Sequence, residues 1–207
     1  MAAGSGARLG ASVPKAFVDV AGRPLLEWSL AALRAAGIEQ IVVALPEGAE
    51  APAGCIGVRG GDTRSASVRA ALEAAPPGDV IVHDAARPLV EPDLFKRVLD
   101  ELRRADCAIA AAPVTDTVKE VEGGIVVGTH DRSKLWAVQT PQAFRRAALT
   151  AALSVDEEIL AAATDDAWLV ERAGGTVRVV ESSPANFKVT TPHDLRVAAL
   201  LLAERKG

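Results

Sequence analysis

Short strand-like segments alternate with amphipathic helical segments along the first half of this chain, and this alternation restricts its possible folds. The strands are predicted at residues 41–45, 55–58, 79–83 and 107–112, and the helices at 24–37, 63–75 and from about 92 onward. The Ile-Val-Val-Ala-Leu run at 41–45 has no polar face, which is typical of parallel sheets covered on both sides. Such alternation builds right-handed βαβ units. We therefore predict an α/β fold with three α/β/α layers and a mostly parallel, twisted sheet.

The second half of the chain departs from this alternation at residues 113–132. Two β-branched runs there, 117–121 and 125–129, flank a Glu-Gly-Gly turn, which is typical of a β-hairpin. Because an isolated hairpin is only marginally stable in water, we expect this one to be the arm that makes a homodimer. Further helices are predicted at 141–153, 165–173 and 192–204, with a strand at 176–180. No linker interrupts the chain, so residues 1–207 should form a single domain.

The composition predicts a globular protein without a strongly charged surface. Hydrophobic residues make up 49% of the chain and charged residues 24%, and the net charge is −4. Because there is no overall basic field, neither nucleic acid nor a membrane is an expected partner. No apolar run approaches the roughly 20 residues that span a bilayer, and no signal peptide is recognised, so the cytoplasm is the default location. Cys55 and Cys107 are predicted core residues, and the histidines lack metal-ligand spacing.

The first 15 residues resemble a phosphate-binding loop. Gly4 and Gly6 allow the backbone to approach a ligand closely, and Arg8 and Lys15 add two cations. The stretch lacks the third glycine of a dinucleotide loop and the Lys-Ser/Thr pair of a Walker loop. It therefore predicts a polyphosphate site of another kind, the alternative being a glycine-rich surface turn with two solvated cations.

Other polar residues follow the predicted strands, at the sheet edge where α/β proteins bind ligands. Asp84 and Arg87 come just after the strand at 79–83, and the Gly60-Gly61 turn follows the strand at 55–58. A doubly wound unit would also place a strand directly before the first loop, for which the sequence leaves no room. Either the true start lies upstream or a central strand is absent, and we favour the first interpretation.

Eight stretches, in order along the chain, carry a family resemblance. They are AAGSGARLG at 2–10, PKAF at 14–17, GGDTRSASV at 60–68, HDAARP at 83–88, PVTDTVK at 113–119, LWAVQTPQAF at 135–144, TDDA at 164–167 and NFKVTTPHDL at 186–195. Together they resemble the 2-C-methyl-D-erythritol 4-phosphate cytidylyltransferases of the non-mevalonate isoprenoid pathway. These belong to the nucleotidyltransferases, whose sheet is a modified dinucleotide-binding type. Since any one stretch alone would be weak evidence, the resemblance rests on their order and spacing.

The resemblance implies a reaction in which methylerythritol 4-phosphate attacks the α-phosphorus of CTP in line and releases pyrophosphate, with Mg²⁺ on the triphosphate. Two anions repel each other, so fixed cations should surround the α-phosphate. By resemblance these catalytic cations are Arg8, Lys15 and Lys188. Taken alone, Lys188 would be interpreted as a solvated strand-edge lysine. No covalent nucleophile or general base is expected, and the direct Mg²⁺ ligands are not assigned.

The resemblance also implies the binding residues. The CTP-binding positions are Ala2, Ala3, Gly4, Gly6, Gly60, Asp62, Arg64, Ser67, Asp84 and Ala85. The positions expected on the side of the sugar-alcohol phosphate are Asp84, Arg87, Thr117, Arg132, Thr140 and Thr164. Of these, Thr117 and Arg132 are expected to reach the active site of the neighbouring subunit. From the residues alone, Arg64 could equally be an exposed helix arginine and Asp84 a helix cap.

Three other functions stay open. A ribitol 5-phosphate cytidylyltransferase would share the first loop and the NFKVTTP segment, although PVTDTVK and LWAVQTPQ favour the methylerythritol branch. A sugar 1-phosphate nucleotidyltransferase would share only the type of first loop. A non-catalytic nucleotide-binding protein of the same fold would be expected to lack Arg8, Lys15 or Lys188, and all three are present.

Overall fold

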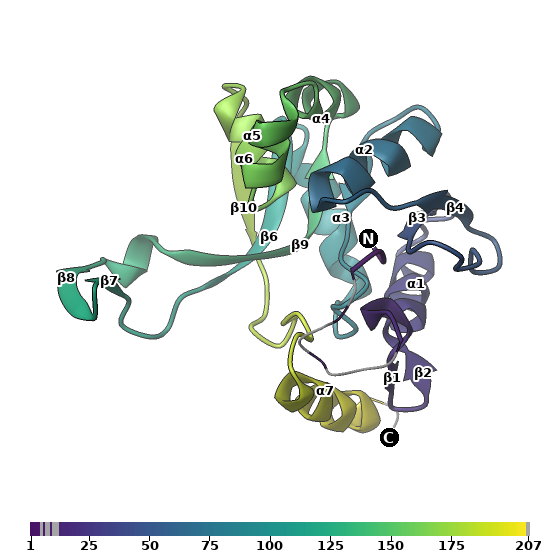
Figure 1. Ribbon diagram of the computed structural model, residues 1–207, viewed down its shortest axis with the longest axis horizontal. Helices are drawn as coiled ribbons and strands as arrows, with labels where there is room; N and C mark the ends of the chain where they lie inside the picture. The colour runs from purple at the N-terminus through teal and green to yellow at the C-terminus, as the bar shows by residue number, and fades with distance from the viewer. Residues whose placement is uncertain (5, 7–8, 10–12, 206–207) are drawn as a thin grey trace.

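The computed structural model describes residues 1–4, 6, 9 and 13–205, and its centre is a four-stranded sheet with the order β10-β6-β9-β5 (Figure 1). These strands are β5 (Val80–Val82), β6 (Cys107–Pro113), β9 (Trp136–Phe144) and β10 (Val177–Glu181). β10 is parallel to β6, whereas β9 is antiparallel to both β5 and β6. The prediction of a mostly parallel sheet is therefore wrong for its centre, which is mixed. β9 returns beside β6 after the hairpin without a crossover helix, and such a return gives antiparallel pairing.

The predicted helix at 141–153 is wrong at its beginning. Residues up to Phe144 belong to β9, and α4 spans only Arg146–Leu153. Pro141 suggested a helix start, but it lies where the pairing of β9 with β6 shifts register, between Ile109 and Ala111. A proline without an N–H group is tolerated at such a bulge, so Pro141 does not prevent the stretch from being a strand.

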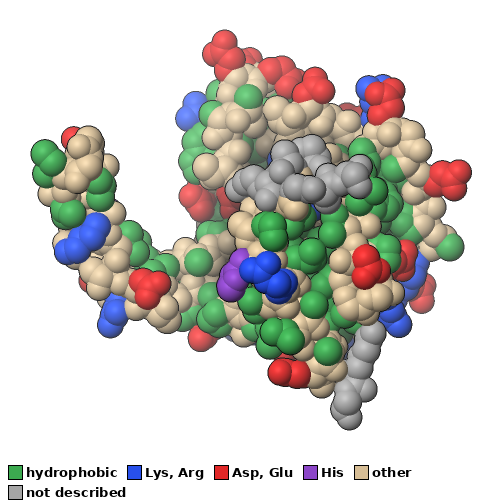
Figure 2. All heavy atoms as spheres, turned by 60° about the horizontal axis from the view of Figure 1, so that its bottom comes forward, with side chains coloured by type: hydrophobic (Ala, Val, Ile, Leu, Met, Phe, Trp, Pro, Cys, Tyr) green, Lys and Arg blue, Asp and Glu red, His purple; other side chains and the backbone are tan. Residues whose placement is uncertain are grey.

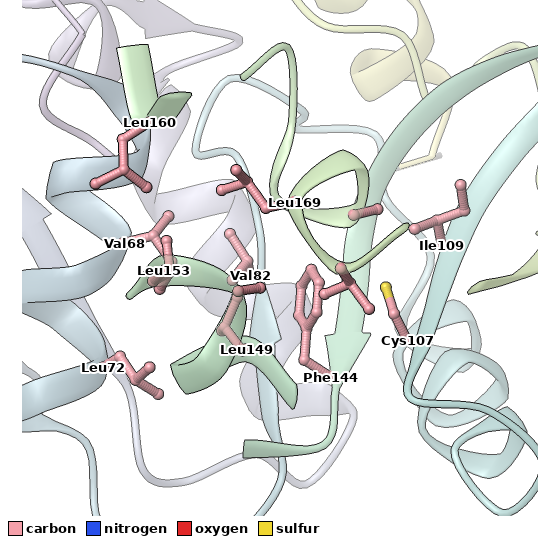
Figure 3. Close-up of a cluster of buried hydrophobic side chains, with 13 residues drawn as sticks. Val68, Leu72, Val82, Cys107, Ile109, Phe144, Leu149, Leu153, Leu160 and Leu169 are labelled. Atoms are coloured by element: carbon pink, nitrogen blue, oxygen red, sulfur yellow. The ribbon is translucent and has the colours of Figure 1, made fainter. Parts of the chain in front are cut away.

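Helices cover both faces of this sheet. Cys107 and Ile109 of β6 point to one face, against α4 and α6 (Asp166–Arg172), with α2 (Arg64–Ala74) and α5 (Glu157–Ala162) beyond them (Figure 3). Ala108 and Ala110 point to the other face, against α3 (Pro92–Glu101) and α1 (Leu25–Ala35). Because helices cover both faces of β6, the side chains on each face are buried, and the strand has almost no polar residue. Cys107 is a core residue, as predicted, whereas Cys55 is only half-buried.

The predicted elements outside the main sheet are largely present. The strands predicted at 41–45 and 55–58 are β3 (Val42–Leu45) and β4 (Ile56–Arg59), which pair in parallel. The last predicted helix is α7 (Pro192–Glu204), which begins at a capping box formed by Thr191 and Asp194. The short elements among the described residues include β1 (Asp19–Val20), β2 (Arg23–Pro24) and the 3₁₀ turns η2 (Lys15–Phe17) and η3 (Arg132–Lys134). Among all described residues, no helix combines the length and the apolar character that crossing a membrane requires.

The chain begins between β3 and β5. The backbone N–H of Ala2 donates to the Ala44 carbonyl (2.9 Å), and the Met1 carbonyl accepts from Ala85 N–H (3.1 Å). The amino group of Met1 donates to the His83 carbonyl (2.6 Å). These bonds link the ends of the two strands, so the chain enters its first loop from the position where the sequence predicts a preceding strand.

β7 (Lys119–Glu122) and β8 (Ile125–Thr129) form an antiparallel pair that stands away from the body of the molecule (Figures 1 and 2). Val121, Ile125, Val126 and Val127 are exposed on it, with Ile125 at 71%. Four exposed large apolar residues on so small an element form a hydrophobic surface that no other described residue covers.

Candidate active site

Two neighbouring pockets lie beyond the carboxyl ends of β3 and β5. The first has a volume of about 400 Å³ and is lined by the N-terminal loop, the turn at 61–64 and residues 84–86. The second, of about 370 Å³, is lined by residues of β9 and by Thr164, Asp165 and Trp168. Arg64, Asp84 and Lys188 line both pockets. A ligand in one pocket would therefore meet a ligand in the other beside these three charged side chains.

Asp84 is the buried anion at this boundary. Its backbone N–H donates to the Thr140 hydroxyl (3.0 Å), which fixes the turn after β5. One carboxylate oxygen accepts from Lys188 Nζ at 2.7 Å, and the other lies 3.6 Å from Arg64 Nε. Burial raises the pKa of this carboxyl, but Lys188 and Arg64 outweigh burial and hold the pKa well below its usual range. Asp84 is therefore ionised and paired, and it does not act as the helix cap that was the alternative.

Lys188 is positioned by a loop that is fastened at several points. Arg87 is buried, and its guanidinium donates to the Asn186 carbonyl (2.7 Å). The Asn186 side chain donates to the Thr140 carbonyl (3.0 Å), and Val189 N–H donates to the Ala86 carbonyl (2.8 Å). These bonds direct Lys188 toward Asp84. Its side chain is 41% exposed, but it lies in a loop and pairs with a buried carboxylate, unlike a lysine at a strand edge. Arg87 acts here by holding the loop, and burial lowers its pKa despite the nearby Asp84.

Arg64 is the first residue of α2, and two carboxylates hold its side chain. One is Asp84, and the other is Asp166, which is fully buried and accepts from the Arg64 guanidinium. Burial lowers the pKa of Arg64, but Asp166 and Asp84 more than compensate, so that its pKa is raised. The side chain is only 26% exposed, which contradicts its interpretation as an exposed helix arginine.

Sequence reasoning missed Asp166. The TDDA stretch contains two adjacent acids, and Asp165 caps α6 by accepting from Trp168 N–H (2.9 Å). Since Asp165 occupies the cap, the next carboxylate belongs to the first turn of the helix and can point inward. Burial raises the pKa of Asp166, and Arg64 opposes this effect. The two adjacent acids, Asp165 and Asp166, at the start of an apolar helix were the available signal that one of them is buried.

The first loop brings Lys15 to the first pocket. Gly6 has φ +73°, and a Cβ there would lie 2.8 Å from the Cβ of Lys15, so glycine is required for this approach. Lys15 N–H donates to the Gly4 carbonyl (3.3 Å), which closes the turn. Lys15 lines the pocket, as predicted, while Arg8 lies outside the described residues.

The turn after β4 forms the opposite side of the first pocket. A Cβ on Gly60 would lie 2.3 Å from the Cβ of Ala3, so this glycine allows the turn and the N-terminal segment to touch. The Ser67 hydroxyl accepts from Gly61 N–H (3.0 Å) and donates to the Thr63 carbonyl (2.9 Å), which holds the turn in shape. The predicted residues that line the pocket here are Ala2, Ala3, Gly4, Asp62, Arg64, Ser67, Asp84 and Ala85.

The residues predicted for the second substrate fall into two groups. Arg87, Thr140 and Thr164 line the second pocket, although the Thr140 hydroxyl also bonds to the neighbouring backbone and to His83. Thr117 and Arg132 are exposed near the base of the hairpin and line neither pocket of this chain. The Arg132 guanidinium donates to the Thr115 carbonyl (2.6 Å). Their role in a neighbouring subunit stays a prediction.

Comparison with known proteins identifies the family. The sequence-family model of the 2-C-methyl-D-erythritol 4-phosphate cytidylyltransferases, named IspD, matches residues 1–204. The chain belongs to the IspD family. The 2-C-methyl-D-erythritol 4-phosphate cytidylyltransferase of Deinococcus radiodurans is 49% identical to this chain. The alignment covers 100% of this chain and 89% of that protein. One from Nocardia farcinica is 47% identical, over 99% of this chain and 92% of its own length.

A solved IspD structure supports the same assignment. The crystal structure of 2-C-methyl-D-erythritol 4-phosphate cytidylyltransferase from Thermus thermophilus aligns with a TM-score of 0.85 and 42% identity. The alignment covers 98% of this chain and 96% of that one. The α/β fold of this chain is therefore the IspD fold.

Proposed function

We propose that this chain is a cytidylyltransferase that joins CTP to 2-C-methyl-D-erythritol 4-phosphate and releases pyrophosphate. The observation that carries the proposal is the meeting of two pockets at Arg64, Asp84 and Lys188. A nucleotide in the first pocket and a sugar-alcohol phosphate in the second would bring their phosphates together there. Membership of the IspD family supports this substrate pair.

The reaction is a direct displacement. An oxygen of the substrate phosphate forms a bond to the α-phosphorus of CTP, and the bond from that phosphorus to the bridging oxygen of the β-phosphate breaks. The main barrier is the repulsion between two anions, so the chain's part is to supply positive charge and alignment. Lys15 and Lys188 supply charge from two sides of the first pocket, with Arg8 as a third proposed cation. The attacking phosphate is already ionised at neutral pH, so no general base is needed.

The first pocket suits cytidine. The backbone of Ala2 and Ala3 and the turn held by Ser67 offer fixed N–H and C=O groups, which suit the edge of a small base. Asp62 lies exposed at the same pocket and could accept from hydroxyl groups of the ribose. Rigid backbone groups discriminate well between bases because they cannot move to accommodate another hydrogen-bonding pattern.

We propose that Mg²⁺ enters with the triphosphate. In the parts of the chain that the structure describes, no three His, Cys, Asp or Glu residues gather to hold a metal ion by themselves. Mg²⁺ is usually held by one or two carboxylates together with phosphates and water, and Asp84, with Asp62 at the same pocket, fits such a partial set. When bound, the ion would neutralise charge on the phosphates.

We also propose a cytoplasmic homodimer that is held by the hairpin. The exposed Val121, Ile125, Val126 and Val127 suit a surface that a second copy covers. Thr117 and Arg132 lie at the base of the same hairpin, where they could contact the substrate phosphate in the second pocket of the partner. Each active site would then be shared between two chains.

The test is pyrophosphate release by the purified chain with CTP and Mg²⁺. Methylerythritol 4-phosphate and ribitol 5-phosphate are offered in parallel, and release is expected only with the first. Release only with ribitol 5-phosphate would refute the proposed substrate and keep the mechanism. ATP, GTP and UTP serve as nucleotide controls, and equal rates with them would refute the cytidine assignment of the first pocket.

A further inference from the structure

The ion pair of Arg64 and Asp166 joins the two sides of the active site. Arg64 is the first residue of α2, which follows the turn at the first pocket, and its side chain lines both pockets. Asp166 is the first residue of α6. Thr164 and Asp165, just before it, line the second pocket and not the first. The pair therefore connects the helix beside the first pocket to the helix beside the second.

Asp166 does not meet a ligand in either pocket. Its side chain is fully buried and belongs to the lining of neither pocket. One carboxylate oxygen accepts from the Arg64 guanidinium, and the other has no hydrogen-bond partner among the described residues. Within that part of the chain, Arg64 is the one cation that pairs with Asp166. The charge of Asp166 therefore acts on a ligand through Arg64.

Two acids share Arg64 unequally. Its Nη1 donates to Asp166, whereas its Nε lies 3.6 Å from the nearer oxygen of Asp84, which is too far for a hydrogen bond. Asp84 has a closer partner in Lys188, whose Nζ lies 2.7 Å from the other oxygen. Asp166 thus holds Arg64 back from Asp84. Without the charge of Asp166, the buried carboxylate of Asp84 would draw the guanidinium into a closer pair.

The position of Arg64 determines which of its donors face the pockets. A guanidinium has five N–H donors, and the bond to Asp166 uses one of them. The side chain is 26% exposed and lines both pockets, so the remaining donors border the space in which two phosphates would meet. Donors that are fixed before a ligand binds stabilise its charge most effectively, because they do not reorganise during the reaction.

We propose that Asp166 is a positioning residue of the active site, which holds Arg64 between the two pockets so that the guanidinium donates to the phosphates and does not close on Asp84. This role rests on the proposed function, since it requires phosphates on both sides of Arg64. Asp166 itself touches neither substrate. A buried residue of the helix beside the second pocket should therefore affect the binding of CTP in the first pocket.

The first test is a double-mutant cycle on the full chain, with kcat/KM for pyrophosphate release as the readout. Asp166→Asn keeps the shape of the side chain and removes its charge, and kcat/KM is expected to fall about 30-fold. In an Arg64→Gln background the same change should alter kcat/KM by less than about twofold, because the residue through which it acts is absent. A loss of equal size in both backgrounds would overturn the proposal.

The binding of CTP separates this role from a structural role in α6. Thr164 and Trp168 line only the second pocket, so a distorted α6 would raise KM for the second substrate and leave CTP binding unchanged. If Asp166 acts through Arg64, Kd for CTP with Mg²⁺ in calorimetry should rise about tenfold in Asp166→Asn. Leu169→Ala, which removes another buried side chain of α6, is the control for stability and should keep Kd within about twofold. An unchanged Kd in Asp166→Asn would overturn the proposal.

The unliganded protein provides a readout that does not depend on the reaction. In a crystal structure of Asp166→Asn, the Arg64 guanidinium is expected to lie about 3 Å from Asp84, in place of 3.6 Å. An Arg64 side chain that keeps its position there would overturn the proposal, even with an active enzyme. A wild-type chain that releases no pyrophosphate would refute the proposed function, and the position of Arg64 in the variant would still decide whether Asp166 holds it.

Discussion

Acidification should destabilise this protein through His83, a histidine that is buried as a neutral group. Its Nδ1 lies 3.0 Å from the Thr140 hydroxyl, and its ring packs edge-on against Phe95. The Thr140 hydroxyl accepts from Asp84 N–H, so its own hydrogen is free to point to the imidazole, which then accepts at Nδ1. Burial, the largest effect, lowers the pKa of His83 to about 3, although Asp84 opposes it.

The size of the effect follows from linkage. In the unfolded chain the His83 pKa is about 6.5, so acid protonates the unfolded state first and stability is lost as the pH falls from about 6.5 toward 3. Between pH 7 and pH 5 the loss from this residue is about 2 kcal/mol. The amino group of Met1, with its pKa lowered to about 6, adds a loss that begins near pH 8. A variant at His83 separates the two contributions.

The assay is urea unfolding at pH 7 and pH 5 of the wild type, His83→Gln and His193→Gln. The exposed His193 serves as the matched control. The free energy of unfolding should fall by about 2 kcal/mol more in the wild type and in His193→Gln than in His83→Gln. Equal pH dependence in all three proteins, or an NMR titration of His83 near pH 6.5, would refute the reasoning.

Four further outcomes are expected. Lys188→Gln should lower kcat/KM for pyrophosphate release by about 100-fold or more, while the chain still folds because Arg64 remains beside Asp84; an unchanged rate would remove Lys188 from the site. Asp166→Asn should destabilise the fold by about 3 kcal/mol in urea unfolding, since the guanidinium above it loses its buried partner; unaltered stability would contradict that pairing. Gly60→Ala should raise KM for CTP about tenfold, because the added methyl displaces the N-terminal segment, with KM for the second substrate as the control. Ile125→Glu should halve the molar mass in light scattering and abolish activity, whereas a fully active monomer would refute a shared site.

The elements that the sequence predicted well are those with local signals. α7 begins where Thr191 and Pro192 mark a helix start, and the run at 41–45 is apolar because β3 is buried. Pro141 misled the prediction because its meaning depends on a register shift with β6, a strand about 30 residues away. The antiparallel direction of β9 depends on the same long-range pairing, which no local pattern reveals.

The sequence predicted the site residues that the family resemblance names. It did not predict residues whose role depends on being buried. Asp84 and Lys188 were expected at the site and lie 2.7 Å apart there. Asp166 was missed because only the packing of α6 shows that its carboxylate points inward beneath Arg64. His83 was missed for the same reason, since a histidine after an apolar strand gives no sign of being neutral and enclosed.

The shared ion pairs of Asp84 have a consequence for selectivity among cellular anions. Asp84 and Asp166 balance Arg64 and Lys188, so these four side chains carry no net charge before a ligand arrives. A small anion such as inorganic phosphate could bind Lys188 only by breaking its ion pair with Asp84, and Asp84 would gain no other cation. A triphosphate that carries its own metal ion can provide Asp84 with a replacement cation. If CTP binds with Mg²⁺ as proposed, the centre would favour ligands that bring their own cation, and simple anions would compete for it poorly.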